Sequence, residues 1–69
     1  MGIKAVQNEI GRRLKLLRKE KEFSQEYVAN EIKLSRDHLS TIENGKYPLN
    51  INTLYKLAEF YGVDLKYFF

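Results

Sequence analysis

One short polar stretch of this 69-residue chain, from Ser35 to Thr41, carries the side chains best suited to contacting nucleic acid. Arg36 has a planar fork of donors that fits guanine O6 and N7 or a phosphate group. Asp37 can accept a hydrogen bond from the amino group of cytosine, can orient Arg36, or can stabilise the start of a helix through its macrodipole. Ser40 and Thr41 add hydroxyl groups, so the stretch predicts a polar helix edge that fits a DNA major groove.

Apolar residues around this stretch predict the elements that must hold it. They are Val28, Ile32, Leu34, Leu39 and Ile42. The first two lie one helical turn apart, the last two nearly so, and residues 33–35 leave room only for a tight corner. Two helices that cross there need a small residue between them, and Ala29 stands at that position. The pattern therefore predicts two short helices, with the polar side of the second facing solvent.

Capping residues divide the whole chain into five short helices. The caps are Asn8, Ser24, Ser35, Asn50 and Asp64, and the helices are expected at about 9–21, 25–32, 36–44, 51–61 and in a last turn at 65–69. Gly45 and Gly62 can take the left-handed conformation that ends a helix, and Pro48 favours an extended bridge. No segment alternates as a strand would, so the prediction is an all-α fold, a compact five-helix domain.

Two of these helices carry the apolar stripes expected to build the core. The stripes are Ile10, Leu14 and Leu17 in the first helix, and Ile51, Leu54, Leu57, Ala58 and Tyr61 in the fourth. Gly11 lies beside the first stripe, where a glycine weakens a helix by up to about 1 kcal/mol relative to alanine. We therefore expect another backbone to pack closely against Gly11.

Composition limits the kind of protein. A chain of 69 residues has room for one domain, which we place at 1–69 with its core at about 8–69. It has no cysteine and one histidine, His38, so neither a metal site nor a cofactor is expected. No apolar run approaches the ~20 residues that span a bilayer and no secretory leader is evident, so a cytoplasmic location is expected. The net charge is +3, and many of the positively charged residues lie in the first third of the chain. This distribution is typical either of a solvated helix face or of a surface that binds nucleic acid.

Four segments, in this order and spacing, resemble the helix-turn-helix domain of the lambda repressor and Cro type, often called the XRE-like family. They lie at residues 10–19, 23–26, 42–46 and 54–63, so the likeness covers about residues 10 to 69. Its most specific parts are Ser24-Gln25 and the run Ile42-Glu43-Asn44-Gly45-Lys46. The resemblance implies a five-helix, lambda-repressor-like domain with the helix-turn-helix at the second and third helices.

The resemblance also implies roles for individual residues. The outward positions of the recognition helix, expected to read bases, are Arg36, Asp37, Ser40 and Thr41. Contacts to the DNA backbone are expected from Gln25, Ser35, Asn44 and Lys46, with His38 and Tyr47 as further candidates from their places in the chain. Arg18 and Glu43 match a buried ion pair that ties the first helix to the end of the third. Any of these side chains can instead be an ordinary surface residue.

Two positions depart from the family pattern. Glycine usually precedes the first serine and stands in the corner between the two helices, whereas this chain has Glu22 and Lys33 there. A residue other than glycine held at positive φ costs on the order of 1 kcal/mol. Replacing Lys33 with glycine is therefore expected to stabilise the fold.

Together these features predict a sequence-specific, double-stranded DNA-binding transcriptional regulator, either a repressor or a controller-type protein. One small core can hardly bury all the aromatic residues near the C-terminus, so a homodimer on a palindromic operator is expected. These residues are Tyr55, Phe60, Tyr61, Tyr67, Phe68 and Phe69.

A regulator of this kind can also contact RNA polymerase, and the sequence leaves that alternative open. The alternative is a protein-interaction module, such as an antitoxin whose main partner is a protein. No nucleophile–base pair, phosphate loop or metal-ligand cluster stands in the sequence, so an enzyme is not expected.

Overall fold

The protein, represented by a computed structural model, is described over residues 2–46 and 49–69. Within these ranges the chain forms four α-helices and one 3-10 helix, and no strand. The elements are α1 (Ile3–Glu20), α2 (Gln25–Glu31), α3 (Arg36–Glu43), α4 (Ile51–Tyr61) and the 3-10 helix η1 (Leu65–Phe68). The predicted all-α class is confirmed, and the expected fifth helix is a single 3-10 turn rather than an α-helix.

Side-chain caps begin four of the five elements. The hydroxyl oxygens of Ser24 and Ser35 accept hydrogen bonds from the backbone N–H groups of Tyr27 and His38, at 3.0 and 3.1 Å. Asn50 caps α4 in the same way at 2.7 Å, and Asp64 caps η1 at 3.3 Å. These caps satisfy N–H groups that a helix leaves without partners, which is why the predicted starts of α2, α3 and α4 are confirmed.

The predicted start of the first helix is wrong. The helix α1 begins at Ile3 after Gly2, which supplies no side-chain cap, and Asn8 lies inside it. Asn8 packs against Gly45 instead, since a Cβ atom added to Gly45 would fall on the Asn8 side chain. No proline interrupts residues 3–8, and Val6 packs against the core, so the helix continues two turns toward the N-terminus.

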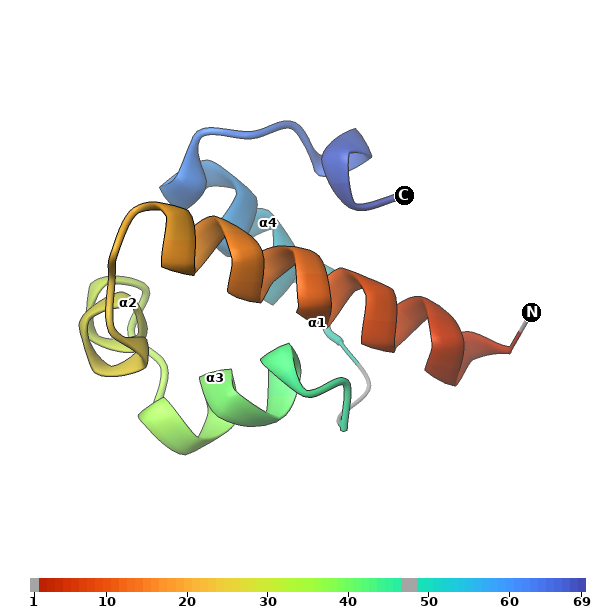
Figure 1. Ribbon diagram of the computed structural model, residues 1–69, viewed down its shortest axis with the longest axis horizontal. Coiled ribbons are helices and arrows are strands. Elements are labelled where there is room, and N and C mark those ends of the chain that lie inside the picture. Colours follow the sequence, from red (N-terminus) through yellow and green to blue (C-terminus); the bar gives the residue numbers. More distant parts are fainter. Residues whose placement is uncertain (1, 47–48) are drawn as a thin grey trace.

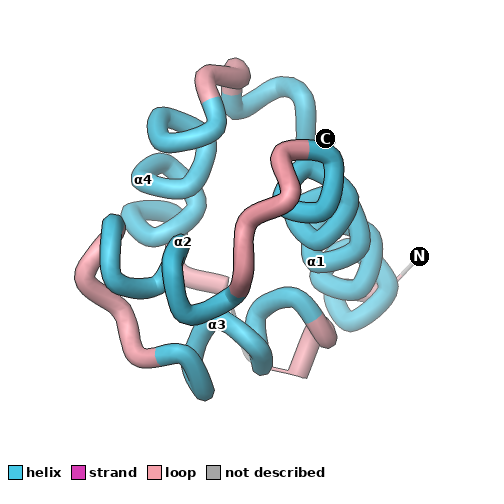
Figure 2. The backbone as a smooth tube through the Cα atoms, turned by 60° about the vertical axis from the view of Figure 1, so that its left-hand side comes forward, coloured by secondary structure: helices cyan, strands magenta, loops and turns pink. Residues whose placement is uncertain are grey.

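The core lies between α1 and the other three α-helices. In Figure 1, α1 runs along the length of the molecule with α3 below it and α4 behind it. Figure 2 shows α1 and α4 on either side of the core, with α3 beneath them. The largest fully buried side chains come from every α-helix and are Leu14, Leu39, Leu54, Leu57 and Val28. The small residue Ala29 is buried as well, at 1% exposure.

The close approach expected at Gly11 is confirmed. A Cβ atom added there would lie 2.6 Å from the carbonyl oxygens of Ile42 and Glu43, closer than real Cβ atoms come. Only glycine lets the α1 backbone pack this tightly on the last turn of α3. This contact fixes α3 against α1 and leaves the opposite side of α3 uncovered by α1.

One expected core residue is not buried. Ile51, the first residue of α4, is 57% exposed, whereas Leu54, Leu57, Ala58 and Tyr61 are buried as predicted. The helical spacing places Ile51 on the same face as the others, but its first turn extends past the end of the core.

Candidate nucleic-acid interface

The face of α3 turned away from the core is polar. Arg36 and Asp37 are exposed in its first turn, and Ser40 and Thr41 are half-buried one turn later. We call these four residues the α3 polar face. Behind it, Leu39 and Ile42 are 0% and 4% exposed, so the helix is anchored on its apolar side. The segment 36–41 is therefore helical and directed outward, along the lower edge of the molecule in Figure 1.

Hydrogen bonding within α3 limits what each side chain can offer. The Thr41 hydroxyl donates to the backbone carbonyl oxygen of Asp37 at 2.6 Å, or to that of His38 at 3.0 Å. Its proton is therefore used within the helix, and its methyl group and oxygen lone pairs remain for an external contact. Across the described part of the chain, no hydrogen bond or ion pair engages the side chain of Arg36 or of Asp37, so these two side chains are not paired with each other.

The corner before α3 has the strained backbone that its sequence implies. Lys33 has φ of 62° and Glu22, in the preceding connection, has φ of 59°. Both therefore lie in the left-handed region that favours glycine, as predicted. The corner is closed by a hydrogen bond from the N–H of Leu34 to the carbonyl oxygen of Ala29, at 2.8 Å.

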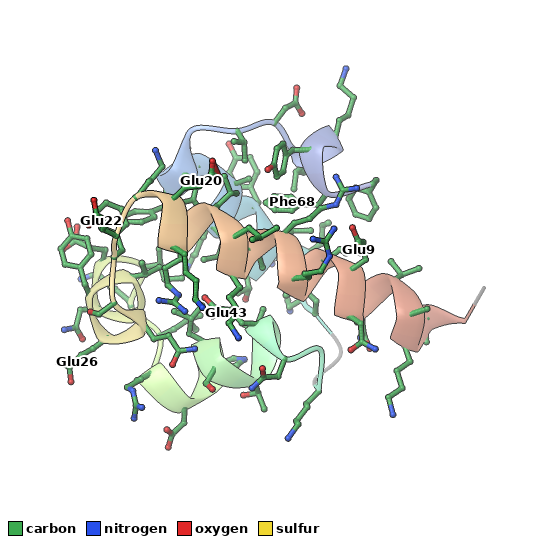
Figure 3. All side chains as sticks on the ribbon, viewed as in Figure 1. Glu9, Glu20, Glu22, Glu26, Glu43 and Phe68 are labelled. Carbon is green, nitrogen blue, oxygen red and sulfur yellow. The ribbon has the colours of Figure 1, made fainter. Side chains whose placement is uncertain are left out.

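A buried ion pair connects α1 to the end of α3. Arg18 Nε donates to Glu43 Oε2 at 2.8 Å and Arg18 Nη2 donates to Glu43 Oε1 at 3.1 Å. The two side chains are 11% and 1% exposed, and Figure 3 shows Glu43 between α3 and α1. Arg18 Nη1 also donates to the carbonyl oxygen of Phe23 at 2.9 Å, so the same side chain holds the connection that leads into α2.

A buried tyrosine stands near this ion pair. The Tyr61 hydroxyl is buried, and no hydrogen-bond partner reaches it among the residues that the structure describes. Burial, together with the negative charge of Glu43, raises the pKa of Tyr61 to about 12. The hydroxyl therefore stays protonated at neutral pH.

Gln25 joins the ion pair to the surface. Its Nε2 donates to Glu43 Oε1 at 3.1 Å, and it is the first residue of α2. A surface hollow of about 470 Å³ is lined by Arg18, Ser24, Gln25, Glu26 and Arg36. The structure thus brings Gln25 and Arg36 to one hollow between the starts of α2 and α3. The Gln25–Glu43 contact was not predicted, because the two residues lie 18 positions apart and neither type signals the other.

The remaining predicted contact residues flank α3. Ser35 caps the start of α3, His38 is exposed in its first turn, and Asn44 and Lys46 are exposed after its end. Gly45 between them has φ of 69°, the left-handed conformation expected there. Tyr47, and the bridge predicted around Pro48, lie outside the described residues.

A second surface, away from α3, is apolar. An apolar groove of about 140 Å³ lies between the start of α1, the start of α4 and the C-terminus; its lining residues are Ile3, Val6, Gln7, Ile10, Leu49, Ile51, Leu54 and Phe69. We call it the apolar groove. Ile3 and Phe69 on it are 77% and 73% exposed. Of the aromatic residues near the C-terminus, Tyr61 and Phe68 are buried, whereas Tyr55, Tyr67 and Phe69 are exposed.

Two short helices joined by a tight corner, the second anchored by the core and polar on its outer face, define a helix-turn-helix protein. Comparison with known proteins agrees. Residues 11–69 match a family described as a helix-turn-helix domain. The chain belongs to the XRE-like helix-turn-helix family of DNA-binding transcriptional regulators.

Three similar proteins place the chain within that family. Control protein C.MunI of Mycoplasma sp is 43% identical over 60 residues, which cover 86% of this chain and 81% of that protein. The crystal structure of the restriction-modification controller protein C.AhdI from Aeromonas hydrophila superposes with a TM-score of 0.90 at 28% identity, over 100% of both chains. The regulator RamB of Mycobacterium tuberculosis is 36% identical over 59 residues, and this chain spans only 12% of its length. In the described part of the chain, α1 is the longest helix, and no helix has the length and apolar character to cross a bilayer.

Proposed function

We propose that this protein binds a specific sequence in double-stranded DNA as a homodimer and acts as a controller-type transcriptional regulator in the cytoplasm. The observation that carries the proposal is the α3 polar face, which projects outward from a helix anchored by buried Leu39 and Ile42. A helix presented in this way fits the width of a major groove. The likeness to proteins named control protein and restriction-modification controller supports this role.

Within this proposal, the α3 polar face reads base edges. Arg36 supplies a bidentate donor for guanine, and Asp37 supplies an acceptor for cytosine. Thr41 contributes its methyl group and oxygen, because its hydroxyl proton is bound within the helix. Ser40 is the fourth residue that contacts a base.

Contacts to the sugar-phosphate backbone of the DNA come from a second set of residues, which are Gln25, Ser35, His38, Asn44, Lys46 and Tyr47. Ser35 accepts a bond as the α3 cap, so its own hydroxyl proton stays available for a phosphate.

The homodimer is proposed to form through the apolar groove. Its exposed residues Ile3, Ile51 and Phe69 gather at one end of the molecule, where a second copy can cover them. The longest extent of the molecule is 32 Å. Two copies joined end to end can therefore present their α3 helices about 34 Å apart, the spacing of successive major grooves on one side of a duplex.

Selection from a random duplex library with the purified protein tests the function. We expect a recovered sequence with two inverted half-sites about 10 base pairs apart, centre to centre. Arg36→Met should weaken binding to that sequence by about 1–3 kcal/mol and relax the preference at one position in each half-site. Lys56→Met is the matched control, because it removes one positive charge from α4 instead. No enrichment, together with no salt-dependent binding between about 50 and 200 mM salt, would instead favour a protein-interaction module.

Sedimentation equilibrium tests the dimer separately. Ile51→Glu places a charge in the apolar groove and should shift the protein to a monomer. Leu16→Glu adds the same charge at an apolar residue that is 47% exposed and lies outside the groove, and it should leave the dimer intact. A wild-type protein that stays monomeric at micromolar concentration would contradict the dimer. The direction of regulation depends on how the DNA-bound protein affects RNA polymerase. A repressor blocks access of the polymerase to the promoter, whereas an activator contacts the polymerase directly.

A further inference from the structure

The buried Glu43 carboxylate accepts more hydrogen bonds than an ion pair requires. Oε2 accepts from Arg18 Nε at 2.8 Å, and Oε1 accepts from both Arg18 Nη2 and Gln25 Nε2 at 3.1 Å. The Glu43 side chain is 1% exposed, so these donors replace the water that would otherwise solvate its charge. Arg18 already satisfies the charge. Arg18 and Gln25 both line the surface hollow, and Gln25 is the member of this network that is not buried.

This third hydrogen bond determines how Gln25 is oriented. A carboxylate only accepts hydrogen bonds, so the Gln25 amide must turn its nitrogen, and not its oxygen, toward Glu43. The amide nitrogen carries two protons, and one of them forms the hydrogen bond to Glu43. The second proton is left as a donor on a side chain that can no longer rotate freely. Arg36 lines the same hollow and adds a positive charge, while Glu26 on its edge adds a negative one.

We propose that Glu43 is a positioning residue for DNA binding: it fixes the Gln25 amide so that its second N–H donates to a phosphate oxygen beside Arg36. The inference rests on the proposed function. In the free protein, a freely rotating amide directs its oxygen toward the phosphate position as often as its nitrogen, although only the nitrogen can donate to a phosphate oxygen. Such an amide also loses rotamer freedom on binding. Glu43 removes both costs before DNA arrives, which is the general effect of preorganisation.

The first test observes Gln25 in the free protein by NMR. In ¹⁵N-labelled wild-type protein, the Gln25 side-chain amide should be rigid on the nanosecond timescale and slow to exchange its bound proton. The side-chain amide of Asn30, which is exposed on the same helix, provides the internal control and should be more mobile. On adding a random-sequence duplex at low salt, one of the two Gln25 amide protons should shift far more than the other. A Gln25 amide as mobile as that of Asn30, or one unaffected by the duplex, overturns the proposal.

The second test is a double-mutant cycle on affinity for the same random duplex, because a phosphate contact does not depend on sequence. Gln25→Ala should weaken binding by about tenfold to a hundredfold, as expected for one hydrogen bond to a charged group. Glu43→Gln, measured at low temperature with a stabilising osmolyte and checked for folding by circular dichroism, should weaken binding by a similar factor. The double variant should lose no more than either single variant. Asn30→Ala, which removes an exposed amide from the other end of α2, should bind as the wild type does.

The outcomes separate the two proposals. Folded Glu43→Gln that binds as tightly as the wild type, or losses that multiply in the double variant, overturn the positioning role while DNA binding stands. If Glu43→Gln does not fold, the NMR measurement on the wild type and the Gln25→Ala affinity decide the question. A wild-type protein with no salt-dependent affinity for any duplex overturns the proposed function, and the positioning role with it.

Discussion

Helix α1 takes part in two sets of glutamate–arginine ion pairs, one buried and one exposed, and the two have different consequences. Near its C-terminal end, Arg18 meets Glu43 of α3, 25 residues away in the chain, and both side chains are buried. Nearer the middle of the helix, Glu9 accepts hydrogen bonds from Arg12 and Arg13 of the same helix, at 2.7 to 3.1 Å, and is exposed. Figure 3 shows Glu9 on the side of α1 that faces the C-terminal segment, and Glu43 on the opposite side, toward α3.

The difference shows that burial and chain separation, rather than short distances, determine what an ion pair does. The pair around Glu9 stabilises only a helix turn that already exists, and solvent screens it. The pair around Glu43 holds α3, the α1–α2 connection and Gln25 in one arrangement. One half of α1 thus anchors the proposed DNA-binding surface. The N-terminal half lines the apolar groove, and Arg13, near the middle of α1, donates to the carbonyl oxygen of Tyr67 in the C-terminal segment at 2.7 Å.

Removing one arginine from each pair is the strongest challenge to this contrast. Arg18→Met leaves the Glu43 charge buried without its partner and should cost about 3–5 kcal/mol of unfolding free energy, enough to unfold much of so small a domain. Arg12→Met is the matched control and should leave the unfolding midpoint unchanged within error. Urea titrations followed by circular dichroism measure both. Equal effects of the two variants would contradict the contrast.

Gly11→Ala tests the backbone contact between the middle of α1 and the last turn of α3. The added methyl group would meet the carbonyl oxygens of Ile42 and Glu43 at 2.6 Å, so the helices must separate. We expect a loss of about 1–3 kcal/mol, which outweighs the gain of up to about 1 kcal/mol in helix propensity. At Gly2, with nothing within 4 Å of the added atom, alanine should be tolerated. Thermal unfolding of both variants provides the comparison, and a stabilised Gly11→Ala would show that the helices do not pack this closely.

Lys33→Gly should have a smaller effect of the opposite sign. Glycine adopts φ of 62° without the strain that lysine suffers there, so the melting temperature should rise by an amount equivalent to about 1 kcal/mol or less. The same substitution at Lys56, inside α4, should lower it by a comparable amount because glycine is a poor helix former. A clear fall with Lys33→Gly would mean that the corner has a different backbone geometry.

The pH dependence of stability should show the smallest effect, at the exposed pair. The hydrogen bond from Arg12, followed by that from Arg13, lowers the pKa of Glu9 from 4.5 to about 2. Because the folded pKa lies below the unfolded one, the unfolded chain takes up the proton first as the pH falls. The contribution of Glu9 is therefore complete above its ordinary pKa and is lost between there and about pH 2. Comparing the melting temperatures of the wild type and Glu9→Gln across this range measures it; parallel curves would rule the contribution out.

How far the sequence predicted this structure depended on whether a signal was local. The starts of α2, α3 and α4 follow from Ser24, Ser35 and Asn50, whose side chains cap the helix that comes directly after them. The start of α1 was missed because Gly2 carries no capping side chain, whereas Asn8 resembles a cap and is used for packing.

The sequence predicted which residues form the candidate DNA-binding site, but not the hydrogen bonds that their side chains make. The resemblance to a known family directed attention to Arg18, Glu43 and the outward residues of α3. It did not predict that Gln25 donates to Glu43, or that the Thr41 hydroxyl bonds within its own helix. Such contacts depend on how side chains meet after the helices have packed. Helical spacing also assigned Ile51 to the core, because periodicity shows which face a residue lies on and not where the core ends.

Mapping the DNA contact by NMR tests the central claim most directly. The ¹⁵N-labelled protein is titrated with the duplex recovered by selection, and signal changes are assigned residue by residue. We expect the largest changes in the segment 36–41, with further changes at Gln25, Asn44 and Lys46. Changes confined to the apolar groove or to the far side of α4, with 36–41 unaffected, would contradict the assignment of α3 as the DNA-reading helix.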